Sequence, residues 1–398
     1  MNKKRIFNWY IMRKVLLTVC ICACRFSLFA QQHQKTALLK DKNFNVEIDG
    51  KKVHLYTLNN KNGVTAQFTN YGGRWLSIWT PDVRGIFSDL ILGFDNIKGY
   101  QHAAEKYHGA ITGRICGRIN NGVFELEGQT YHLANNDFFG SPVKNHLHGG
   151  IEGFHKKMWD AEQGVNENNE PYIRFSYLSK DGEEGYPGNL NVNVRYTLSE
   201  ANALRIEYQA TTDQTTLVNL TNHAYFNLSG NPAQSVSNHI LYVNADKYVE
   251  CDKELVPTGN IIPLKGLPID FSIPTAVGAN LDAYFPEMMK GKGFAIAYAI
   301  NPSKEELGLV ARLTDPESGR TMDVYSNQPS LQVYNAWLMD GTDTGKNNIS
   351  YHCGAGIVLE TQGFPDAPNH PAFPQVTLKP EEVYRHIAVY DFGITSDK

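Results

Sequence analysis

Cysteine is scarce in this chain of 398 residues, which contains six of them. Three lie within the first 30 residues, and the other three, Cys116, Cys251 and Cys353, are far apart in the sequence. An odd and scattered set of this kind excludes a disulfide framework. We therefore expect these three cysteines to be buried thiols that act as small apolar side chains.

Positive charge is also in short supply. The chain has 37 Lys and Arg residues against 41 Asp and Glu residues, and six of the basic residues fall within the first 30 positions. Without that segment the balance is 31 basic against 41 acidic residues, a net charge of −10. Such a surplus of negative charge excludes nucleic acid and anionic lipid as partners.

The apolar stretch near the N-terminus, VLLTVCICAC, is too short to span a bilayer. A basic head precedes it and a small residue, Ala30, ends the segment, which predicts a secretory signal over residues 1–30 with cleavage after Ala30. Residues 31–398 would then be a periplasmic or exported protein. As an alternative, Cys24 could be lipidated and tether the chain to a membrane. An uncleaved anchor is disfavoured because Arg25 interrupts the apolar stretch.

A sustained helical period of 3.6 residues is missing from the chain beyond residue 44. Short runs of alternating apolar and polar residues take its place, most clearly in NVNVRYTLSEANALRIEYQA, where two alternating runs flank a turn and predict a β-hairpin. No linker, repeat or low-complexity tract divides residues 31–398. We predict an all-β fold, one large antiparallel domain with few short helices, with a two-domain division as the alternative.

Four segments combine polar groups with turn residues in a way that a plain strand does not need. They are TGRICGRINNG with Arg114 and Arg118, KNHLHGG with His146 and His148, LVNLTNHAYFNLSG with His223, and GIVLETQGFPDAPNHP with Glu360. Taken singly, each has a structural explanation, such as an arginine in an ion pair or a histidine satisfied within a turn. Taken together, they predict convergence on one polar cleft.

The residue types in these segments favour acid–base chemistry. A carboxylate and one or two imidazoles, with no serine or cysteine placed as a nucleophile, suit general acid and base catalysis. Aromatic, arginine and amide side chains around them suit a neutral ligand rich in hydroxyl groups, such as a sugar. An alternative is a metal site built from the H-x-H-x3-E spacing of His146, His148 and Glu152 together with His223. Nothing near His223 repeats that spacing, so we expect no metal.

In their order along the chain, several segments resemble the blocks of the aldose 1-epimerase (galactose mutarotase) family. These segments are NYGGR, GRICGRINNGVFELEGQTYHL, NHLHGGIEGFHKKMWD, DGEEGYPGNL, VNLTNHAYFNLSG, LVPTG and GIVLETQGFPDAPNHPAFP. The resemblance covers essentially residues 45–392. It implies a single large β-sandwich that binds a free aldose in a cleft on one concave face, acts as a monomer or weak homodimer, and needs no cofactor.

The resemblance also implies roles for individual residues. His223 corresponds to the general acid that protonates the ring oxygen of the sugar, and Glu360 to the base that takes the proton from the anomeric hydroxyl. His148 and Arg118 correspond to residues that bind sugar hydroxyls, and Gln332 to a glutamine that lines the site. We expect the acid and the base to lie on different sides of the ring, a pyranose width apart, with Arg118 as the charge partner of Glu360.

Two positions depart from the family pattern. Gly117, which we include among the substrate-binding positions, replaces an asparagine, and Ala295 replaces an aspartate that binds a sugar hydroxyl. Asp282 lies nearby in the sequence without matching the motif. We therefore expect an anomer-interconverting enzyme that prefers another sugar to glucose or galactose, or binds these two weakly.

Two alternatives to this function remain. One is a sugar-binding protein that has lost efficient turnover. The other is a hexose 6-phosphate epimerase, for which Lys144 and Arg74 are the obvious additional cations.

Overall fold

The computed structural model describes residues 37–137, 144–283 and 293–395. The predicted signal segment and Cys24 lie outside these residues. Leu38–Lys398 form one compact unit. Within the described ranges, the helices are too short or too polar to cross a membrane.

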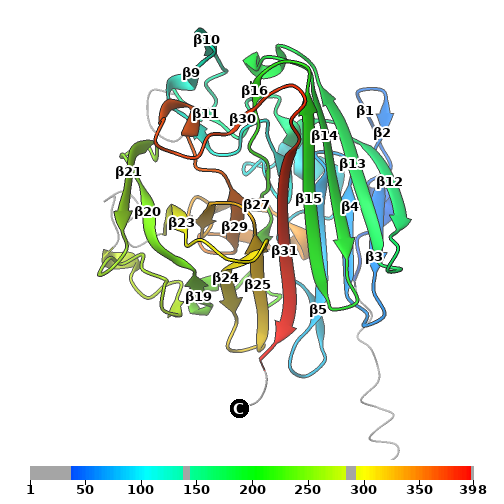
Figure 1. The fold of residues 1–398 in the computed structure, drawn as a ribbon. Coiled ribbons are helices and arrows are strands. Elements are labelled where there is room, and N and C mark those ends of the chain that lie inside the picture. The colour runs from blue at the N-terminus through cyan, green and yellow to red at the C-terminus, as the bar shows by residue number, and fades with distance from the viewer. Residues whose placement is uncertain (1–36, 138–143, 284–292, 396–398) are drawn as a thin grey trace, which may run out of the picture. The chain divides into compact units, whose positions relative to one another are not determined.

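Three antiparallel sheets carry most of the strands (Figure 1). The nine-stranded sheet has the order β12 (Asp160–Val165), β13 (Pro171–Ser179), β14 (Leu190–Leu198), β15 (Ala203–Thr212), β31 (Tyr384–Ile394), β25 (Arg320–Ser326), β24 (Gly308–Thr314), β19 (Ile240–Val243) and β22 (Thr275–Ala276). The six-stranded sheet has the order β18 (Tyr225–Phe226), β29 (Ile357–Gln362), β26 (Ser330–Tyr334), β23 (Ala295–Ile300), β20 (Ala245–Cys251) and β21 (Pro257–Pro263). The four-stranded sheet contains β3 (Leu55–Asn59), β4 (Thr65–Thr69), β5 (Arg74–Pro81) and β6 (Phe87–Asp89).

The remaining elements are short. Two-stranded pairs are β1 (Glu47–Ile48) with β2 (Lys51–Lys52), β7 (Ile111–Thr112) with β17 (Thr221–Asn222), β8 (Arg118–Ile119) with β11 (His146–Leu147), β9 (Val123–Leu126) with β10 (Gln129–His132), β16 (Thr216–Leu217) with β30 (Thr377–Leu378), and β27 (Asp340–Thr344) with β28 (Ser350–His352). The described helices are α2 (Ile97–His102) and the 3-10 turns η1 (Asp41–Asn43), η2 (Asn120–Gly122), η3 (Phe154–Lys156), η4 (Glu183–Gly185), η5 (Val236–Asn238), η6 (Leu281–Ala283), η8 (Lys346–Asn348) and η9 (Ala367–Asn369). The prediction of an all-β fold with few short helices is confirmed.

The hairpin predicted from the alternating pattern is also confirmed. Strands β14 and β15 pair from Leu190↔Thr212 to Leu198↔Leu204, and the intervening residues form the turn. Buried residues alternate with more accessible ones over most of both strands. One face of the hairpin therefore packs into the core while the other faces away from it.

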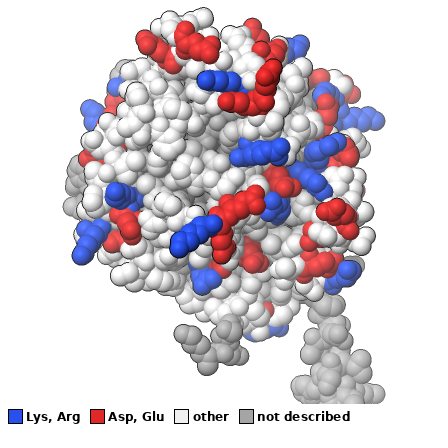
Figure 2. Space-filling model, viewed as in Figure 1, with Lys and Arg blue, Asp and Glu red and all other residues white. Residues whose placement is uncertain are grey.

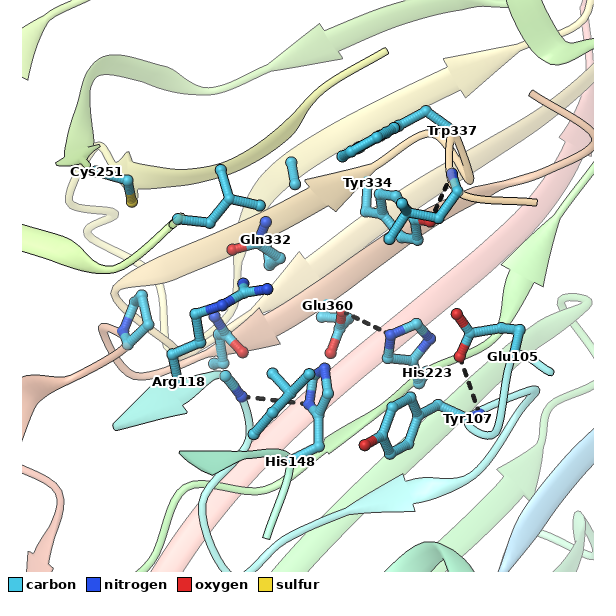
Figure 3. A pocket seen from close by; sticks show the side chains of 17 residues that line it. Glu105, Tyr107, Arg118, His148, His223, Cys251, Gln332, Tyr334, Trp337 and Glu360 are labelled. Carbon is cyan, nitrogen blue, oxygen red and sulfur yellow. Dashed lines mark hydrogen bonds and ion pairs between the residues drawn. The ribbon is translucent and has the colours of Figure 1, made fainter. Parts of the chain in front are cut away.

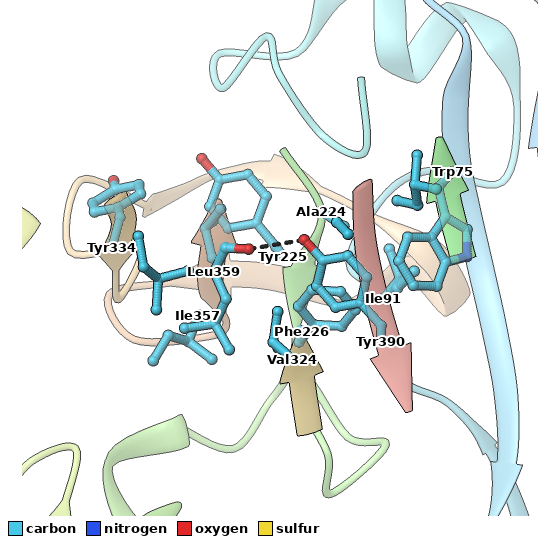
Figure 4. Packing of buried hydrophobic residues seen from close by; sticks show 14 of the residues in the cluster. Trp75, Ile91, Ala224, Tyr225, Phe226, Val324, Tyr334, Ile357, Leu359 and Tyr390 are labelled. Atoms are coloured by element: carbon cyan, nitrogen blue, oxygen red, sulfur yellow. Dashed lines mark hydrogen bonds between the residues drawn. The ribbon is translucent and has the colours of Figure 1, made fainter. Parts of the chain in front are cut away.

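The core lies between the nine-stranded sheet and the six-stranded and four-stranded sheets. Phe226 on β18 packs against Tyr390 on β31, with ring centroids 5.5 Å apart. The Tyr390 hydroxyl also donates a hydrogen bond of 2.9 Å to the carbonyl oxygen of Leu359 on β29 (Figure 4). The strand that carries Glu360 is therefore fixed against the opposite sheet by side-chain packing and by a direct hydrogen bond.

Two expectations from composition can be compared with the structure. Cys116 is buried, but Cys251 is only partly buried and Cys353 is exposed, so the expectation of three buried thiols is wrong for the last two. On the face of the described chain drawn in Figure 2, acidic and basic side chains are intermixed, and no extended basic patch is visible there.

Candidate active site

Glu360 faces away from the core because side chains alternate along strand β29. The Leu359 side chain belongs to the hydrophobic core, and the Thr361 hydroxyl lies 2.8 Å from Nε2 of His386 on β31. Since successive side chains of a strand lie on opposite faces, Glu360 lies on the other face of the six-stranded sheet. An apolar run that ends in a buried carboxylate is thus a strand with its core on one side and a site on the other.

The neighbouring strands extend this face into a floor. Gln332 on β26 is paired directly with Glu360, and Ala295 on β23 is paired with Tyr334. These four side chains line one pocket (Figure 3). The register therefore places Glu360 and Gln332 in one pocket, as the sequence predicted. Ala295, which stands where the family has an aspartate, lies in the same pocket.

The opposite wall comes from the short pair β8 and β11 and from the segment between β17 and β18. Arg118 on β8 pairs with Leu147 on β11, and His148 follows directly. His223 is held by its backbone, which donates to the Ala110 carbonyl and whose own carbonyl accepts from Gly109, both at 2.9 Å. All the predicted catalytic and binding residues line the same pocket: Glu360, His223, His148, Arg118, Gln332 and Gly117.

The pocket is a concave site that is lined by both apolar and polar side chains, as small-molecule sites usually are. Aromatic side chains, Tyr334 and Trp337, stand on one side of it, and the imidazoles stand on the other (Figure 3). This combination of flat apolar faces and polar groups suits a ring that carries hydroxyl groups.

His223 and Glu360 are direct neighbours at the bottom of this pocket. The Nε2 atom of His223 lies 3.5 Å from the Oε1 atom of Glu360, and both side chains are almost fully buried. The expected gap of a pyranose width between them is therefore wrong. The reason is geometric, because the ring oxygen and the anomeric oxygen of a pyranose are both bonded to the same carbon. An acid and a base that serve these two atoms can therefore lie next to each other.

Burial governs the protonation of this pair. Desolvation lowers the pKa of His223 to about 3. Desolvation, and to a lesser extent the charge of Glu105, raises the pKa of Glu360 well above its ordinary value. Burial therefore favours the uncharged forms of both groups, a neutral imidazole and a protonated carboxyl group, which together carry one exchangeable proton.

His148 presents an N–H group to the pocket. Its Nδ1 atom accepts a hydrogen bond of 3.3 Å from the backbone N–H of Gly117, so in the neutral ring Nε2 carries the proton. Burial lowers the pKa of His148 well below its ordinary value and so keeps the ring neutral. His148 is thereby a hydrogen-bond donor of fixed tautomer, suited to a sugar oxygen.

The same tautomer bears on metal binding. Ligand atoms of His148, His223 and Glu360 lie within 4.8 Å of one another, a spacing that could hold a metal ion. A metal-bound histidine normally donates its second N–H to an acceptor, whereas His148 faces the donor N–H of Gly117. The surroundings of His148 thus oppose metal ligation at Nε2.

Arg118 has a different partner from the one expected. Its Nε and Nη2 atoms donate to the two oxygens of the buried Asp137, at 2.7 and 3.4 Å. Among the described residues Glu360 instead pairs with His223. The prediction that Arg118 neutralises Glu360 is therefore wrong, and Asp137 holds the guanidinium at the wall of the pocket.

Three candidate residues have structural roles outside the pocket. Arg114 is buried and donates to the carbonyl groups of Ser179 and Pro187. His146 has both ring nitrogens within hydrogen-bond distance of neighbours, the Ala134 carbonyl and the Tyr186 hydroxyl. Glu152 is exposed and pairs with Lys156, so the alternative metal site built from His146, His148 and Glu152 is wrong.

The two cations considered for a sugar phosphate are engaged elsewhere. Arg74 is buried and donates to the carbonyl groups of Lys106, His108 and His155. Lys144 forms an ion pair of 2.8 Å with Glu254. Neither of them lines the pocket, so the structure does not support the hexose 6-phosphate alternative.

The two departures from the family pattern lie at the pocket. Gly117 has a φ of +74°, a backbone conformation that glycine adopts freely and asparagine tolerates. Ala295 lines the floor and offers no hydrogen-bonding group in the place where the family has an aspartate. Asp282 lies in η6, outside the pocket, and does not replace that carboxylate.

Several pocket residues were not predicted from the sequence. They are Glu105, Tyr107, Tyr334, Trp337, Leu338, Cys251 and Gln362. Tyr107 is central among them, because its ring lies 4.6 Å from that of His148 and 5.6 Å from that of His223. Tyr334 and Gln362 could have been found, because they lie two residues from Gln332 and Glu360 on the same strand faces. Glu105 and Tyr107 lie in a loop with no periodic signal.

Comparison with known proteins gives a consistent result. The family model described as aldose 1-epimerase matches residues 54–391. The human galactose mutarotase is 40% identical over 325 residues, which cover 82% of this chain and 90% of that protein. The aldose 1-epimerase of Escherichia coli is 33% identical over 346 residues, 86% of this chain and 96% of that protein. Among solved structures, an aldose epimerase homologue from C. elegans superposes with a TM-score of 0.77 at 28% identity, over 86% of this chain and 100% of the other.

Proposed function

This chain belongs to the aldose 1-epimerase family, and on that basis we propose that His223 and Glu360 open and reclose the pyranose ring of a free aldose. The protein is an isomerase that interconverts the α and β anomers of aldoses. Ring opening removes a proton from the anomeric hydroxyl and adds one to the ring oxygen. Reclosure on the other face of the aldehyde inverts the anomer.

The shared proton explains how one pair serves both steps. With the proton on His223, the Glu360 carboxylate takes the hydroxyl proton while the imidazolium protonates the ring oxygen. With the proton on Glu360, the pair is set for the reverse step, which closes the ring. A sugar hydroxyl that donates to Glu360 stabilises the carboxylate and so moves the shared proton toward His223.

Other side chains orient the sugar for this exchange. His148 donates from Nε2, Arg118 donates from its guanidinium, and Gln332 offers both an acceptor and donors from the floor. Tyr334 and Trp337 supply apolar surface for the faces of the ring. Fixed orientation of the anomeric carbon against the pair lowers the entropic part of the barrier.

One observation carries the proposal: the 3.5 Å contact between Nε2 of His223 and Oε1 of Glu360. The pair lies buried in a pocket lined by polar and apolar side chains, and among the described residues the second nitrogen of the imidazole and the second oxygen of the carboxylate find no hydrogen-bond partner. Buried polar atoms of this kind are normally satisfied, so the pair is poised to bind a hydroxyl-bearing ligand.

The test is polarimetry on freshly dissolved α-D-glucose and α-D-galactose. Glu360→Gln and His223→Asn should each slow mutarotation by about 10² to 10⁴, the usual contribution of a proton-transferring group. Circular dichroism and thermal unfolding should show that both variants remain folded. A folded Glu360→Gln protein that retains the parental rate would refute the assignment. If the parental protein binds sugar but does not accelerate mutarotation, the alternative of a sugar-binding protein without efficient turnover would be supported instead.

We also propose that the protein is exported after cleavage behind Ala30. The basic head and the short apolar run of residues 1–30 support this location. N-terminal sequencing of the mature protein from its native host should begin at Gln31. Recovery with a lipid on Cys24 would support the tethered form, and an intact N-terminus would refute export.

We further propose a monomer or weak homodimer, which sedimentation at micromolar concentration would test.

A further inference from the structure

We propose that Glu105 is a positioning residue that acts on the shared proton of His223 and Glu360. The proposal rests on the proposed function, because it assigns to Glu105 the control of the pH range in which that pair works. Glu105 lies in the loop between α2 and β7 and lines the same pocket as the pair. Nothing in the family pattern or in the strand periodicity pointed to it.

The placement of Glu105 complements that of Glu360. Figure 3 shows its carboxylate directed toward the ring of His223 from the side opposite Glu360. The Nε2 atom of His223 faces Glu360, whereas Nδ1 is buried and has no hydrogen-bond partner in the part of the chain that the structure describes. An imidazolium carries a proton on both nitrogens, so when His223 is protonated its second N–H lies on the side of a carboxylate.

The loop holds Glu105 in this orientation. Its Oε1 atom accepts a hydrogen bond of 3.1 Å from the backbone N–H of Tyr107. The carboxylate of Asp343 accepts the backbone N–H groups of Ala104 and Glu105, at 2.8 and 3.0 Å. The side chain is thus fixed from its own loop and from β27, which carries Asp343.

The negative charge of Glu105 raises the pKa of both Glu360 and His223. An ionised Glu105 repels the charge of Glu360 and so raises the pKa of that carboxyl group. The same negative charge stabilises a protonated His223 and so opposes the lowering of its pKa by burial. Both macroscopic pKa values of the pair are therefore higher with Glu105 than without it, and the one-proton state lies closer to neutral pH.

Other groups face the pair and have to be considered. Around His223 the rings of His148, Tyr225 and Tyr107 lie 5.2, 5.0 and 5.6 Å away. The charge of Arg74 lowers the pKa of His223. None of these groups carries negative charge in its ordinary form at neutral pH, so they do not substitute for Glu105.

Glu105 itself experiences opposing influences. Burial raises its pKa, as does the charge of Asp343, whereas the Tyr107 N–H group, Tyr225 and Lys106 lower it. The net result is a raised pKa, because burial is the largest influence, and the hydrogen bond from Tyr107 offsets part of it in favour of the ionised carboxylate.

The test is the pH dependence of mutarotation in Glu105→Gln, which keeps the shape and removes the charge. We expect both limbs of the bell-shaped kcat/KM profile to move to lower pH by about one unit, the lower end of the effect of a neighbouring charge. KM and the far-UV circular dichroism spectrum should stay near parental values. Glu105→Asp retains the charge one methylene further away and should shift the profile in the same direction by less.

Asp340→Asn is the matched control, because it removes an exposed carboxylate from the same strand, β27, whose oxygen accepts from the backbone N–H of Thr342 and not from the loop of Glu105. It should leave the profile close to that of the parent. An unchanged profile in Glu105→Gln, or an equal shift in Asp340→Asn, would overturn the proposal. If Glu105→Gln fails to fold, an unchanged profile in Glu105→Asp would overturn it as well. If the proposed function itself were wrong, the observation would differ: Glu360→Gln would keep the parental mutarotation rate, whichever residue stands at position 105.

Discussion

Restoring a carboxylate at position 295 should strengthen galactose binding, and the structure allows the size of the effect to be worked out. Ala295 lies on the pocket floor with a side chain that offers no hydrogen bond. A hydrogen bond between a carboxylate and a sugar hydroxyl contributes about 1.5–3 kcal/mol. Ala295→Asp should gain a contact of this kind if the family's sugar binds here in the family's orientation.

Repulsion from Glu360 opposes this gain. The pairing of Ala295 with Tyr334 and of Gln332 with Glu360 places the two positions two strands and two residues apart. With about 4.8 Å between strands and about 3.4 Å per residue, their Cα atoms are about 12 Å apart. Two unit charges at that distance repel by about 0.3–1.4 kcal/mol for an effective dielectric constant between about 80 and 20. The difference of the two ranges is about 0.1–2.7 kcal/mol, and its middle, about 1–2 kcal/mol, corresponds to a KM for galactose lower by about 5- to 30-fold.

The assay is polarimetry over a range of galactose concentrations, which separates KM from kcat. We expect kcat to change little, because the new carboxylate lies far from Glu360 along the floor. Ala295→Leu is the control of similar size without an acceptor, and it should raise KM. The reasoning would be refuted by a folded Ala295→Asp protein whose KM for galactose equals or exceeds that of the parent.

Three further predictions concern the supports of the site. Arg118→Ala leaves the buried Asp137 without this charge partner and should lower the free energy of unfolding by about 3 kcal/mol, measured with urea, whereas Arg118→Ala combined with Asp137→Asn should recover part of the loss. Gly117→Val should cost about 1–2 kcal/mol more than Gly117→Asn in the same measurement, because φ is +74° there and asparagine tolerates that conformation; equal losses would contradict this. Dialysis against a chelator should leave mutarotation unchanged, since the tautomer of His148 opposes metal ligation, and a loss restored by added metal would contradict that conclusion.

The sequence predicted much of the fold because strand periodicity is a local signal. The alternation of Val192, Val194 and Tyr196 with polar residues requires no knowledge of the rest of the chain, and β14 and β15 formed as expected. Glu360 was found for the same reason, since an apolar run that ends in a carboxylate stands out within a few residues.

The features of the site that the sequence did not predict depend on contacts between segments that are distant in the chain. The separation of His223 and Glu360, the pairing of Arg118 with Asp137, and the place of Glu105 all join segments that are far apart in the chain or that lie in loops without a pattern. Arg118 was assigned to the wrong carboxylate because no property of the sequence distinguishes Asp137 from Glu360 as its partner. Such pairings follow from strand order and loop path, which periodicity leaves open.

The hydrogen bonds that join β29 to β31 limit which sequence changes this protein can accept while it keeps its catalytic pair. Tyr390 and His386 hold alternate residues of β29, so deleting one residue inside the strand would turn Glu360 toward the core and bring an apolar side chain into the pocket. Insertions and deletions are therefore tolerable in the loops that border the pocket but not within this strand. We accordingly expect substrate preference to change through the loops and through substitutions at floor positions such as Ala295. The length of β29 should stay fixed.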